Sequence, residues 1–295
     1  MDNYHKEMEK SKDCNKEGIL LMIMAAFFFA LMAFVIKLLD DIPLMEIVLF
    51  RNIPSMIIIP IIILMKKDTP ILGKNKPFLF LRGFFGALGV TAMFYTYTTM
   101  SITDSTAIQR LSPFFIIIMS IVFLKERYNY KQTPFILLAF IGALFVIKPG
   151  FRTDIFPAIV ALVSAILMGA AHIVIRHLRL SDNYWVIINY YAYITGISAI
   201  ILLLWQGNFV IPDLRNFILL IIIGLSAIGT QIGITLSYRF SPACVVAPYL
   251  YAQIIFAAIL EITFLGVIPD SMSIIGSIMI IISGILHFKC SKNTG

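Results

Sequence analysis

Long apolar runs recur along the whole chain, and they constrain its fold more than any other feature. A helix that crosses the ~30 Å hydrocarbon core of a bilayer needs about 20 apolar residues, so ten such runs would occupy about 200 positions. The chain has 295 residues, of which 60% are hydrophobic and only 13% are charged. This composition lies outside the range of soluble domains. The sequence therefore predicts an all-α polytopic membrane protein, embedded in a lipid bilayer, with no separate soluble domain.

Charged residues, proline and glycine set the ends of these runs, which predict ten transmembrane helices. The first run, at residues 18–36, is too long to be the core of a signal peptide and is expected to remain as a membrane helix. The others are expected at residues 44–65, 78–99, 104–124, 133–148, 155–175, 184–205, 216–238, 243–265 and 271–288. Residues 1–17 are polar and carry charges of both signs, so we expect a cytoplasmic N-terminal segment there.

Lysine and arginine are unevenly distributed among the predicted loops. With the N-terminus inside the cell, sixteen of them fall in cytoplasmic segments, whereas the outer segments hold only Lys37, Lys148, Arg152 and Arg215. An excess of this kind on the cytoplasmic side is typical of membrane proteins. We therefore expect both termini in the cytoplasm. The net charge of +7 then reflects topology rather than nucleic-acid binding.

The second half of the chain can be aligned with the first. Residues 29–39 match residues 168–178 at an offset of 139, and Gly89 corresponds to Gly229 at an offset of 140. Because each half holds five spans, an odd number, the second half is expected to enter the membrane in the opposite direction. Inverted five-helix repeats, here residues 18–150 and 151–290, are typical of carriers that work by alternating access. The alternative is that apolar helices resemble one another through composition alone.

The two five-helix halves and the sequence Leu124-Lys-Glu-Arg127 at the end of span four resemble the EamA-type branch of the drug/metabolite transporter superfamily. The resemblance covers residues 18–290 and implies a multi-pass carrier of a small metabolite in the bacterial inner (cytoplasmic) membrane. The helix-ending glutamate of that branch matches Glu126, whereas the second half reads Leu265-Gly-Val267 and lacks it. The chain as a whole is most similar to the S-adenosylmethionine uptake transporters of obligate intracellular bacteria.

Few charged or titratable side chains fall inside the predicted spans, where each is energetically expensive. They are Glu46, Arg51, Arg82, Asp104, Arg110, His172 and Glu261. Arg82 is expected about one turn from the cytoplasmic end of its helix, where it can reach the lipid headgroups as an anchor. Arg110 is the candidate for gripping an anionic group of the substrate, because Pro113 follows it and can bend the helix towards a cavity.

Arg51, Arg110 and Glu261 are expected at one depth, with Asp104 nearer the outer surface. These side chains can pair with one another, in which case Arg51, Asp104 and Glu261 serve charge pairing or gating. Alternatively, one arginine faces the cavity and binds the substrate through its planar fork. The sequence leaves both interpretations open.

Polar and aromatic residues form two stripes that the repeat offset superimposes. The stripes consist of Thr91, Tyr95 and Thr98 in span three and of Gln231, Thr235 and Tyr238 in span eight. They can line a shared aqueous cavity, or they can form hydrogen bonds between helices. Span nine adds further aromatic and amide side chains on one face. The candidate substrate-binding residues are Arg110, Gln109, Tyr95, Thr91, Gln231, Tyr249, Gln253 and Phe256.

Other features argue against metal, cofactor and enzyme chemistry. Cys14, Cys244 and Cys290 are scattered, and no histidine cluster is present, so neither a metal nor a cofactor is expected. His172 is interpreted as a packing residue, with a proton relay as the alternative. No nucleophile or metal motif of a membrane-embedded enzyme occurs. A channel would not require two inverted halves.

The sequence thus predicts a secondary transporter and not an enzyme, with a small-molecule substrate and a monomeric or dimeric state. The resemblance implies uptake of S-adenosylmethionine, in exchange for S-adenosylhomocysteine. The alternative is an exporter of amino acids, drugs or other small metabolites, which is the default of the broader family. The candidate substrate-binding residues do not decide between these two functions, because the same side chains would also suit an aromatic amino acid or a nucleoside.

Overall fold

The computed structural model describes residues 15–66, 70–100, 102–150, 155–266 and 270–292. All regular elements in these ranges are helical, and ten stretches are long and apolar enough to cross a membrane, as the sequence predicts. Eight of the stretches are single helices. They are α2 (Asn15–Ile36), α3 (Leu44–Met65), α4 (Lys76–Thr99), α7 (Thr133–Ile147), α8 (Ile155–Leu178), α9 (Tyr184–Gln206), α10 (Leu214–Phe240) and α13 (Ser271–Lys292). A short 3₁₀ turn, η1 (Tyr130–Gln132), precedes α7.

The other two stretches are broken helices, and proline accounts for both breaks. The fourth stretch consists of α5 (Ile102–Gln109) and α6 (Ser112–Leu124), and the ninth of α11 (Ala243–Val246), η2 (Ala247–Tyr251) and α12 (Ala252–Leu265). Pro113 has no N–H to donate, and the amide of Phe114 bonds to the carbonyl of Leu111 rather than to that of Arg110. Pro248 lies within the 3₁₀ segment of the ninth stretch. Broken helices of this kind commonly form the binding sites of transporters.

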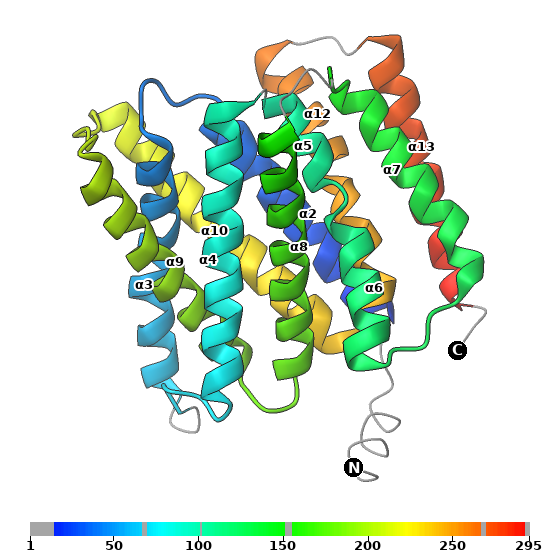
Figure 1. Ribbon diagram of the computed structural model, residues 1–295, viewed down its shortest axis with the longest axis horizontal. Helices are drawn as coiled ribbons and strands as arrows, with labels where there is room; N and C mark the ends of the chain where they lie inside the picture. Colours follow the sequence, from blue (N-terminus) through cyan, green and yellow to red (C-terminus); the bar gives the residue numbers. More distant parts are fainter. Residues whose placement is uncertain (1–14, 67–69, 101, 151–154, 267–269, 293–295) are drawn as a thin grey trace.

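Both ends of the described chain lie at the same end of the bundle, since α2 begins there and α13 finishes there (Figure 1). We refer to this end as the termini end and to the opposite one as the far end. Successive spans alternate in direction between the two, so the first helix of the second half, α8, runs opposite to α2 (Figure 1). The second group of five spans is therefore inverted relative to the first.

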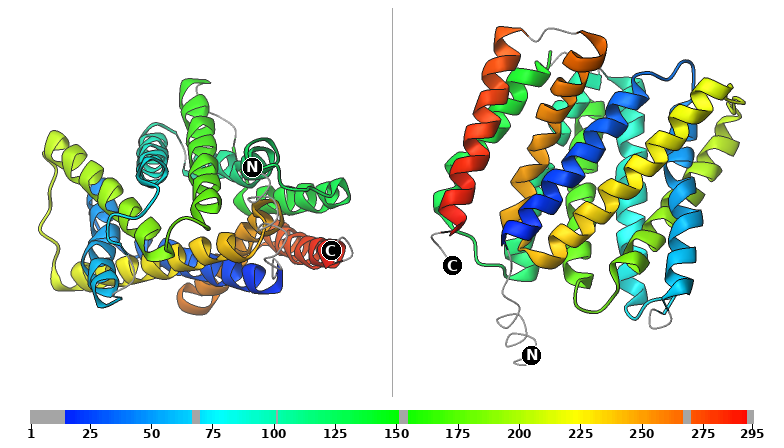
Figure 2. Two further views of the ribbon diagram at one scale, coloured as in Figure 1. Left: turned by 90° about the horizontal axis from the view of Figure 1, so that it is seen from below. Right: turned by 180° about the vertical axis from the view of Figure 1, so that it is seen from behind.

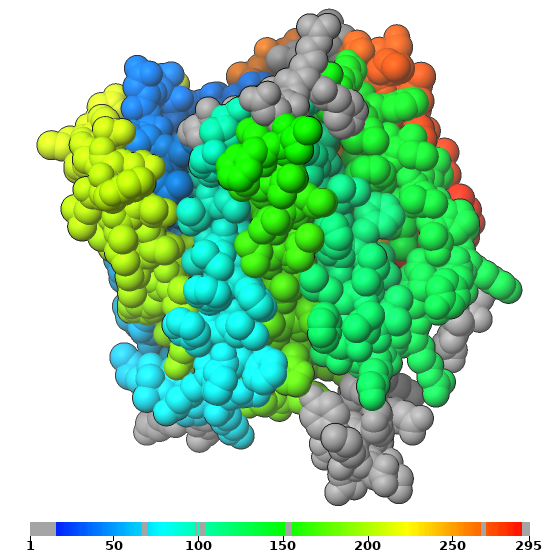
Figure 3. Space-filling view, viewed as in Figure 1, coloured from blue at the N-terminus to red at the C-terminus, as the bar shows by residue number. Residues whose placement is uncertain are grey.

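Helices of the two halves pack against each other in equivalent pairs. The first span of each half packs along the third span of the other, α2 on α10 and α4 on α8. The same spans also contact the broken helices, α2 with α12 and α8 with α6. In the space-filling view α8 lies between α4 and α6 on one face of the molecule, and seen from the end the halves interlock (Figures 2 and 3). A transporter built from two interleaved inverted halves can move one against the other.

The last span of each half meets its counterpart through glycine. A Cβ atom built on Gly142 of α7 would lie 2.7 Å from the carbonyl oxygen of Gly276 in α13, a distance that no side chain tolerates. Small residues at membrane helix contacts allow the backbones to approach closely, which strengthens their van der Waals packing. α7 and α13 therefore form a tight pair at one edge of the bundle (Figure 2).

Candidate substrate site

The breaks in the fourth and ninth spans meet in the interior. The hydroxyl of Tyr251, in η2, donates a 2.6 Å hydrogen bond to the carbonyl oxygen of Arg110, which lies between α5 and α6. That carbonyl is available because the helix is interrupted at Pro113. The prediction that Pro113 disturbs its helix is confirmed, and the hydrogen bond from Tyr251 joins this break to the one around Pro248.

Arg110 is surrounded by polar and aromatic side chains but makes no side-chain hydrogen bond within the described ranges. The hydroxyl of Tyr97 lies beside Thr106, Gln109 and the Arg110 guanidinium. The side-chain amide of Gln109 donates to the hydroxyl of Ser105 at 3.2 Å. Nε of Arg110 is buried without a hydrogen-bond partner in the described part of the chain. A guanidinium carries five N–H donors in a planar fork, so this one is free to bind an anionic group.

A second cluster, which we call the axis cluster, consists of Arg51, Arg82, Tyr191 and Gln231. One terminal nitrogen of Arg51 donates to the hydroxyl of Tyr191 at 3.1 Å, and one of Arg82 donates to the side-chain carbonyl of Gln231 at 3.2 Å. The guanidinium of Arg82 also lies over the Tyr191 ring, 4.2 Å from its centroid. All four side chains are buried.

The axis cluster lies where the two halves meet symmetrically. The offsets of 139 and 140 that relate the neighbouring spans assign Tyr190 or Tyr191 to Arg51, and Arg51 bonds to Tyr191. Equivalent positions of a repeat can touch each other only at the pseudo-twofold axis that relates the halves. Substrate sites of inverted-repeat transporters lie near that axis, between the halves.

The expectation that Arg82 anchors the protein in the lipid headgroups is wrong. Only 3% of the side chain is exposed, and it points to Tyr191 and Gln231 rather than to the surface. Position along the helix suggested an anchor, but depth in the membrane does not determine which face of a helix a residue occupies. Contacts from α9 and α10 hold Arg82 on the interior face.

No carboxylate lies within ion-pair distance of Arg51, Arg82 or Arg110 among the described residues. Glu261 pairs with Lys37 instead, at 3.1 Å. Glu46 accepts a hydrogen bond from the backbone amide of Val210. The sequence allowed these arginines to pair with Glu261, and the structure separates them. Within the described ranges, the guanidinium groups of Arg51, Arg82 and Arg110 thus have neutral partners at most.

The remaining predicted residues are divided between the interior and other surfaces. Gln253 is buried in α12, whereas Phe256 packs edge-on against Phe27 of α2 with ring centroids 5.5 Å apart. Tyr249 donates a 3.3 Å hydrogen bond to the backbone of Gly284 in α13. Tyr95 is 42% exposed and lies edge-on to Phe156.

The two polar stripes also differ in exposure. Gln231, Thr235 and Tyr238 are all buried, whereas Thr91 is half-buried and the side chain of Thr98 lies outside the described residues. His172 is buried with its ring 5.5 Å from that of Tyr238. The second half therefore contributes more of the polar interior than the first.

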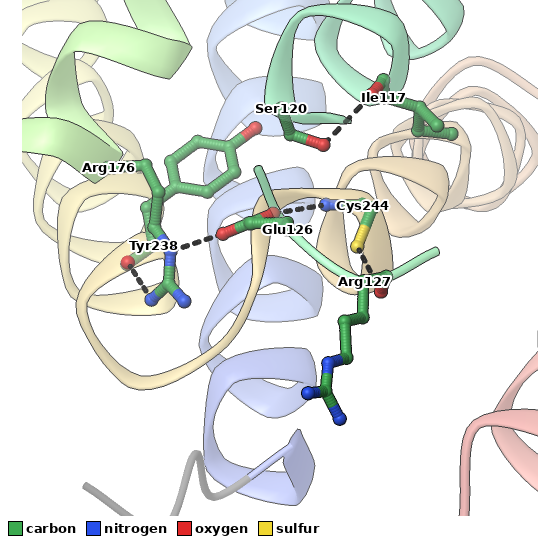
Figure 4. Close-up of polar contacts among 7 residues, drawn as sticks. All are labelled: Ile117, Ser120, Glu126, Arg127, Arg176, Tyr238 and Cys244. Atoms are coloured by element: carbon green, nitrogen blue, oxygen red, sulfur yellow. Dashed lines mark hydrogen bonds and ion pairs between the residues drawn. The ribbon is translucent and has the colours of Figure 1, made fainter. Parts of the chain in front are cut away.

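At the termini end, a buried polar network joins the halves (Figure 4). Nε of Arg176, in α8, lies 2.7 Å from one carboxylate oxygen of Glu126, and both side chains are less than 10% exposed. Arg176 also donates to the carbonyl of Tyr238 at 2.9 Å, while the other oxygen of Glu126 accepts from the amide of Cys244 at 3.3 Å. Nearby, the carboxylate of Asp182 accepts from backbone amides just before α4. Glu126 thus contacts α8 and α11 of the second half directly, and Arg176 extends the network to α10.

At the far end, the halves are joined by exposed ion pairs. They are Lys37 with Glu261, Asp40 with Arg215, and Lys148 with Asp270. Each pair has one member in each half. The sequence aligned Lys37 with Arg176, so the first span of each half ends in a cation that reaches a carboxylate of the other half.

Tyr97, Tyr191 and the Glu126–Arg176 pair were not among the predicted site residues. The repeat offset could have identified Tyr191, because it is the counterpart of Arg51. No comparable signal in the sequence identifies Tyr97. As for metals, the described residues contain no group of three His, Cys, Asp or Glu side chains that could hold an ion.

Comparisons with known proteins agree on one family for this chain. A model described as the EamA-like transporter family matches the chain twice, at residues 16–148 and 155–288. The chain is 30% identical to the pseudopaline exporter CntI of Pseudomonas aeruginosa, over 95% of this chain and 99% of that protein. It is 30% identical to solute carrier family 35 member G1 of Mus musculus, over 94% and 79%, respectively. The S-adenosylmethionine uptake transporter of Rickettsia bellii is 26% identical, over 80% of each chain.

The fold itself also occurs in a solved structure. One crystal structure superimposes with a TM-score of 0.84 and covers 95% of this chain and 99% of its own, at 14% sequence identity. At that identity the likeness concerns the architecture alone.

Proposed function

Because this chain belongs to the EamA-like transporter family, we propose that it is a secondary carrier which moves a small carboxylate-bearing metabolite across the bacterial inner membrane. The observation that supports the substrate class is the set of three arginines without a carboxylate partner in the described ranges, of which Arg51 and Arg82 are buried and Arg110 is half-buried. A buried charge without a counter-ion destabilises a protein by several kcal/mol. An anionic substrate supplies the missing charge when it binds.

Arg110 is the residue proposed to hold the substrate carboxylate. Arg51 and Arg82 each donate to a neutral acceptor, whereas Nε of Arg110 is buried without a hydrogen-bond partner among the described residues. A guanidinium and a carboxylate form two parallel hydrogen bonds, which fix the orientation of the ligand. Tyr97 and Tyr251 lie near Arg110, and aromatic rings attract onium groups.

S-adenosylmethionine is the first candidate substrate. It carries a carboxylate, an ammonium, a sulfonium and a purine, which suit an arginine surrounded by tyrosines. The names of the Rickettsia relatives support this candidate. Export of a different small metabolite is the second candidate, and the name of the Pseudomonas relative, which is more similar in sequence, favours it.

The ion pairs at the two ends support alternating access as the mechanism. In this conformation the termini end is joined by a buried network and the far end by exposed pairs. A site open to the far side would have this arrangement. We propose that the termini end is cytoplasmic, as the distribution of lysine and arginine indicates, and that the Glu126–Arg176 pair must separate for the site to open there.

The test is transport by the purified full chain in liposomes. Entry of labelled S-adenosylmethionine is measured with an excess of unlabelled adenosyl compounds, amino acids or neutral nucleosides. Carboxylate-bearing competitors should reduce entry and neutral nucleosides should not. Competition by nucleosides alone would contradict the proposed carboxylate site. To test export, the same liposomes are preloaded with each compound, and the compound that best accelerates counterflow identifies the substrate.

Arg110→Ala is expected to lower transport by about 10- to 100-fold, which corresponds to the loss of a charge-assisted hydrogen-bond pair. Arg110→Lys retains the charge without the planar fork and should recover only part of the activity. The amount of protein in the membrane should be unchanged in both variants. Normal kinetics in Arg110→Ala would assign Arg110 a purely structural role.

A further inference from the structure

An apolar groove opens on the side of the bundle between α2, α12 and α13, close to the termini end. It has a volume of about 680 Å³. Most of its lining is aliphatic, and includes Ile19 and Ile23 of α2, Ile255 of α12, and Ile280 and Ile281 of α13. The groove is distinct from the arginine sites, because none of Arg51, Arg82 and Arg110 lines it.

The groove is about as long as one leaflet of the bilayer is thick. Along α13 it extends from Ile280 to Lys289, a separation of nine residue steps that spans about 14 Å at 1.5 Å per residue. Half of the ~30 Å hydrocarbon core is about 15 Å. A single acyl chain entering from the termini end would therefore fill the groove without reaching the other leaflet.

The mouth of the groove is positively charged. Lys16, at the start of α2, and Lys289, near the end of α13, lie on opposite walls of the groove at the termini end. The described residues that line the groove include no Asp or Glu. Lysine ammonium groups at this level of a membrane attract the phosphates of anionic lipids.

Between this charged mouth and the aliphatic walls lies a polar side chain with no partner. His287 is 1% exposed and lines the groove, and neither of its ring nitrogens has a hydrogen-bond partner within the described ranges. Its ring lies edge-on to Tyr249, with centroids 5.6 Å apart. Buried polar groups in native proteins are almost always satisfied. The glycerol ester carbonyl of a lipid lies just below the phosphate and would accept a hydrogen bond from His287.

We propose that this groove is a binding site for one anionic phospholipid of the leaflet at the termini end. One acyl chain occupies the aliphatic part, the ester carbonyl accepts from His287, and the phosphate lies between Lys16 and Lys289. The site is separate from the substrate site and does not depend on the identity of the transported compound.

Native mass spectrometry of the full chain, titrated with phosphatidylglycerol or phosphatidylcholine, tests the proposal. The first phosphatidylglycerol should bind about tenfold more tightly than the first phosphatidylcholine. The double variant Lys16→Gln/Lys289→Gln should abolish this preference. Its control, Lys76→Gln/Lys131→Gln, removes two exposed lysines from the same end outside the groove and should keep the preference.

A second pair of variants tests the aliphatic part of the groove. A Cβ atom on Gly284 would meet only Tyr249, at 3.9 Å, so Gly284→Ala is accommodated, whereas Gly284→Phe would extend into the groove. Gly284→Phe should weaken binding of the first lipid of either headgroup by at least tenfold, and Gly284→Ala should not.

Three results would overturn the proposal. They are equal binding of both lipids by the wild type, an equal loss in the two lysine double variants, and a species of twice the mass in place of the lipid adduct. The last result would mean that a second copy of the chain covers the groove.

Discussion

The two ends of the bundle join the first half of the chain to the second in different ways. At the termini end, Glu126 and Arg176 are buried and share their hydrogen bonds with the backbone of α10 and α11. At the far end, Lys37 and Glu261 form a pair whose side chains are 54% and 34% exposed. Water and salt compete with an exposed pair, but they do not reach a buried one.

This difference matters because the ends occupy related positions in the repeat. Arg176 and Lys37 are aligned, yet Glu126 has no acidic counterpart at Gly266, and Glu261 lies five residues earlier in its helix. In the second half, the carboxylate that pairs with Lys37 therefore comes from a position about one helical turn before the counterpart of Glu126. One end of the repeat scaffold is thus joined by a buried ion pair, and the other by an exposed one.

Removing one partner of the buried pair should have the largest effect. Glu126→Gln removes the carboxylate that pairs with the buried Arg176 guanidinium and should destabilise the fold by about 3–5 kcal/mol. The melting temperature of the purified protein in detergent measures this loss. The matched change at the far end, Glu261→Gln, should leave the melting temperature nearly unchanged. Equal losses in the two variants would contradict the comparison.

Opening of the termini end should be detectable at Cys244, whose amide bonds to Glu126 and whose side chain is buried. In Glu126→Gln, alkylation of Cys244 by a maleimide should be at least about tenfold faster than in the wild type, because local opening exposes the thiol. Cys14→Ser and Cys290→Ser remove the other thiols from both proteins. Unchanged alkylation would mean that the pair does not keep this end closed.

The exposed pair of Lys37 and Glu261 should contribute less to the free energy of unfolding, and its contribution should depend on the salt concentration. Lys37→Gln is expected to change the free energy of unfolding by about 0.2–1 kcal/mol at low ionic strength. Raising the salt concentration to 1 M should remove most of the difference from the wild type, because the Debye length then falls to about 3 Å. A difference that persists in 1 M salt would mean that the pair is shielded from solvent.

The smallest effect on the melting temperature is expected from a substitution of Asp270, which lies outside the membrane-spanning helices. Hydrogen bonds from Lys148 and Ser273 lower the pKa of this carboxyl to about 2. A depressed pKa gives a stabilising contribution that is present above about pH 4 and is lost as the pH falls through about 2. The melting temperatures of wild type and Asp270→Asn should therefore differ by a small, constant amount from pH 5 to pH 8 and converge below pH 4. A difference that varies between pH 5 and pH 8 would contradict this assignment.

The sequence predicted the architecture well because the signals for it are local. The length of each apolar run determines the span that it forms. Pro113 and Pro248 interrupt their helices locally, through the missing N–H of proline. Arg82 shows where this reasoning stops. Its place along α4 follows from the sequence, but the face it occupies depends on Tyr191 and Gln231, which lie in helices more than 100 residues later.

The candidate site was predicted only in part for the same reason. Gln109 and Arg110 are neighbours in the sequence and lie together beside the break. Tyr95 and Tyr249 share helical faces with polar residues, but packing against α8 and α13 directs them elsewhere. Which charges pair was not predictable, because Lys37 and Glu261 are brought together only by the contact of α2 with α12.

The bond between Arg51 and Tyr191 has a consequence for how such a protein can arise. A side chain on the symmetry axis of a homodimer faces its own copy, so identical subunits would place arginine against arginine or tyrosine against tyrosine. A donor facing a different acceptor there requires that the two positions be encoded separately. When both halves are encoded in one gene, a donor such as Arg51 can face an acceptor such as Tyr191 at the centre of the molecule. Identical subunits cannot form such a pair on their symmetry axis.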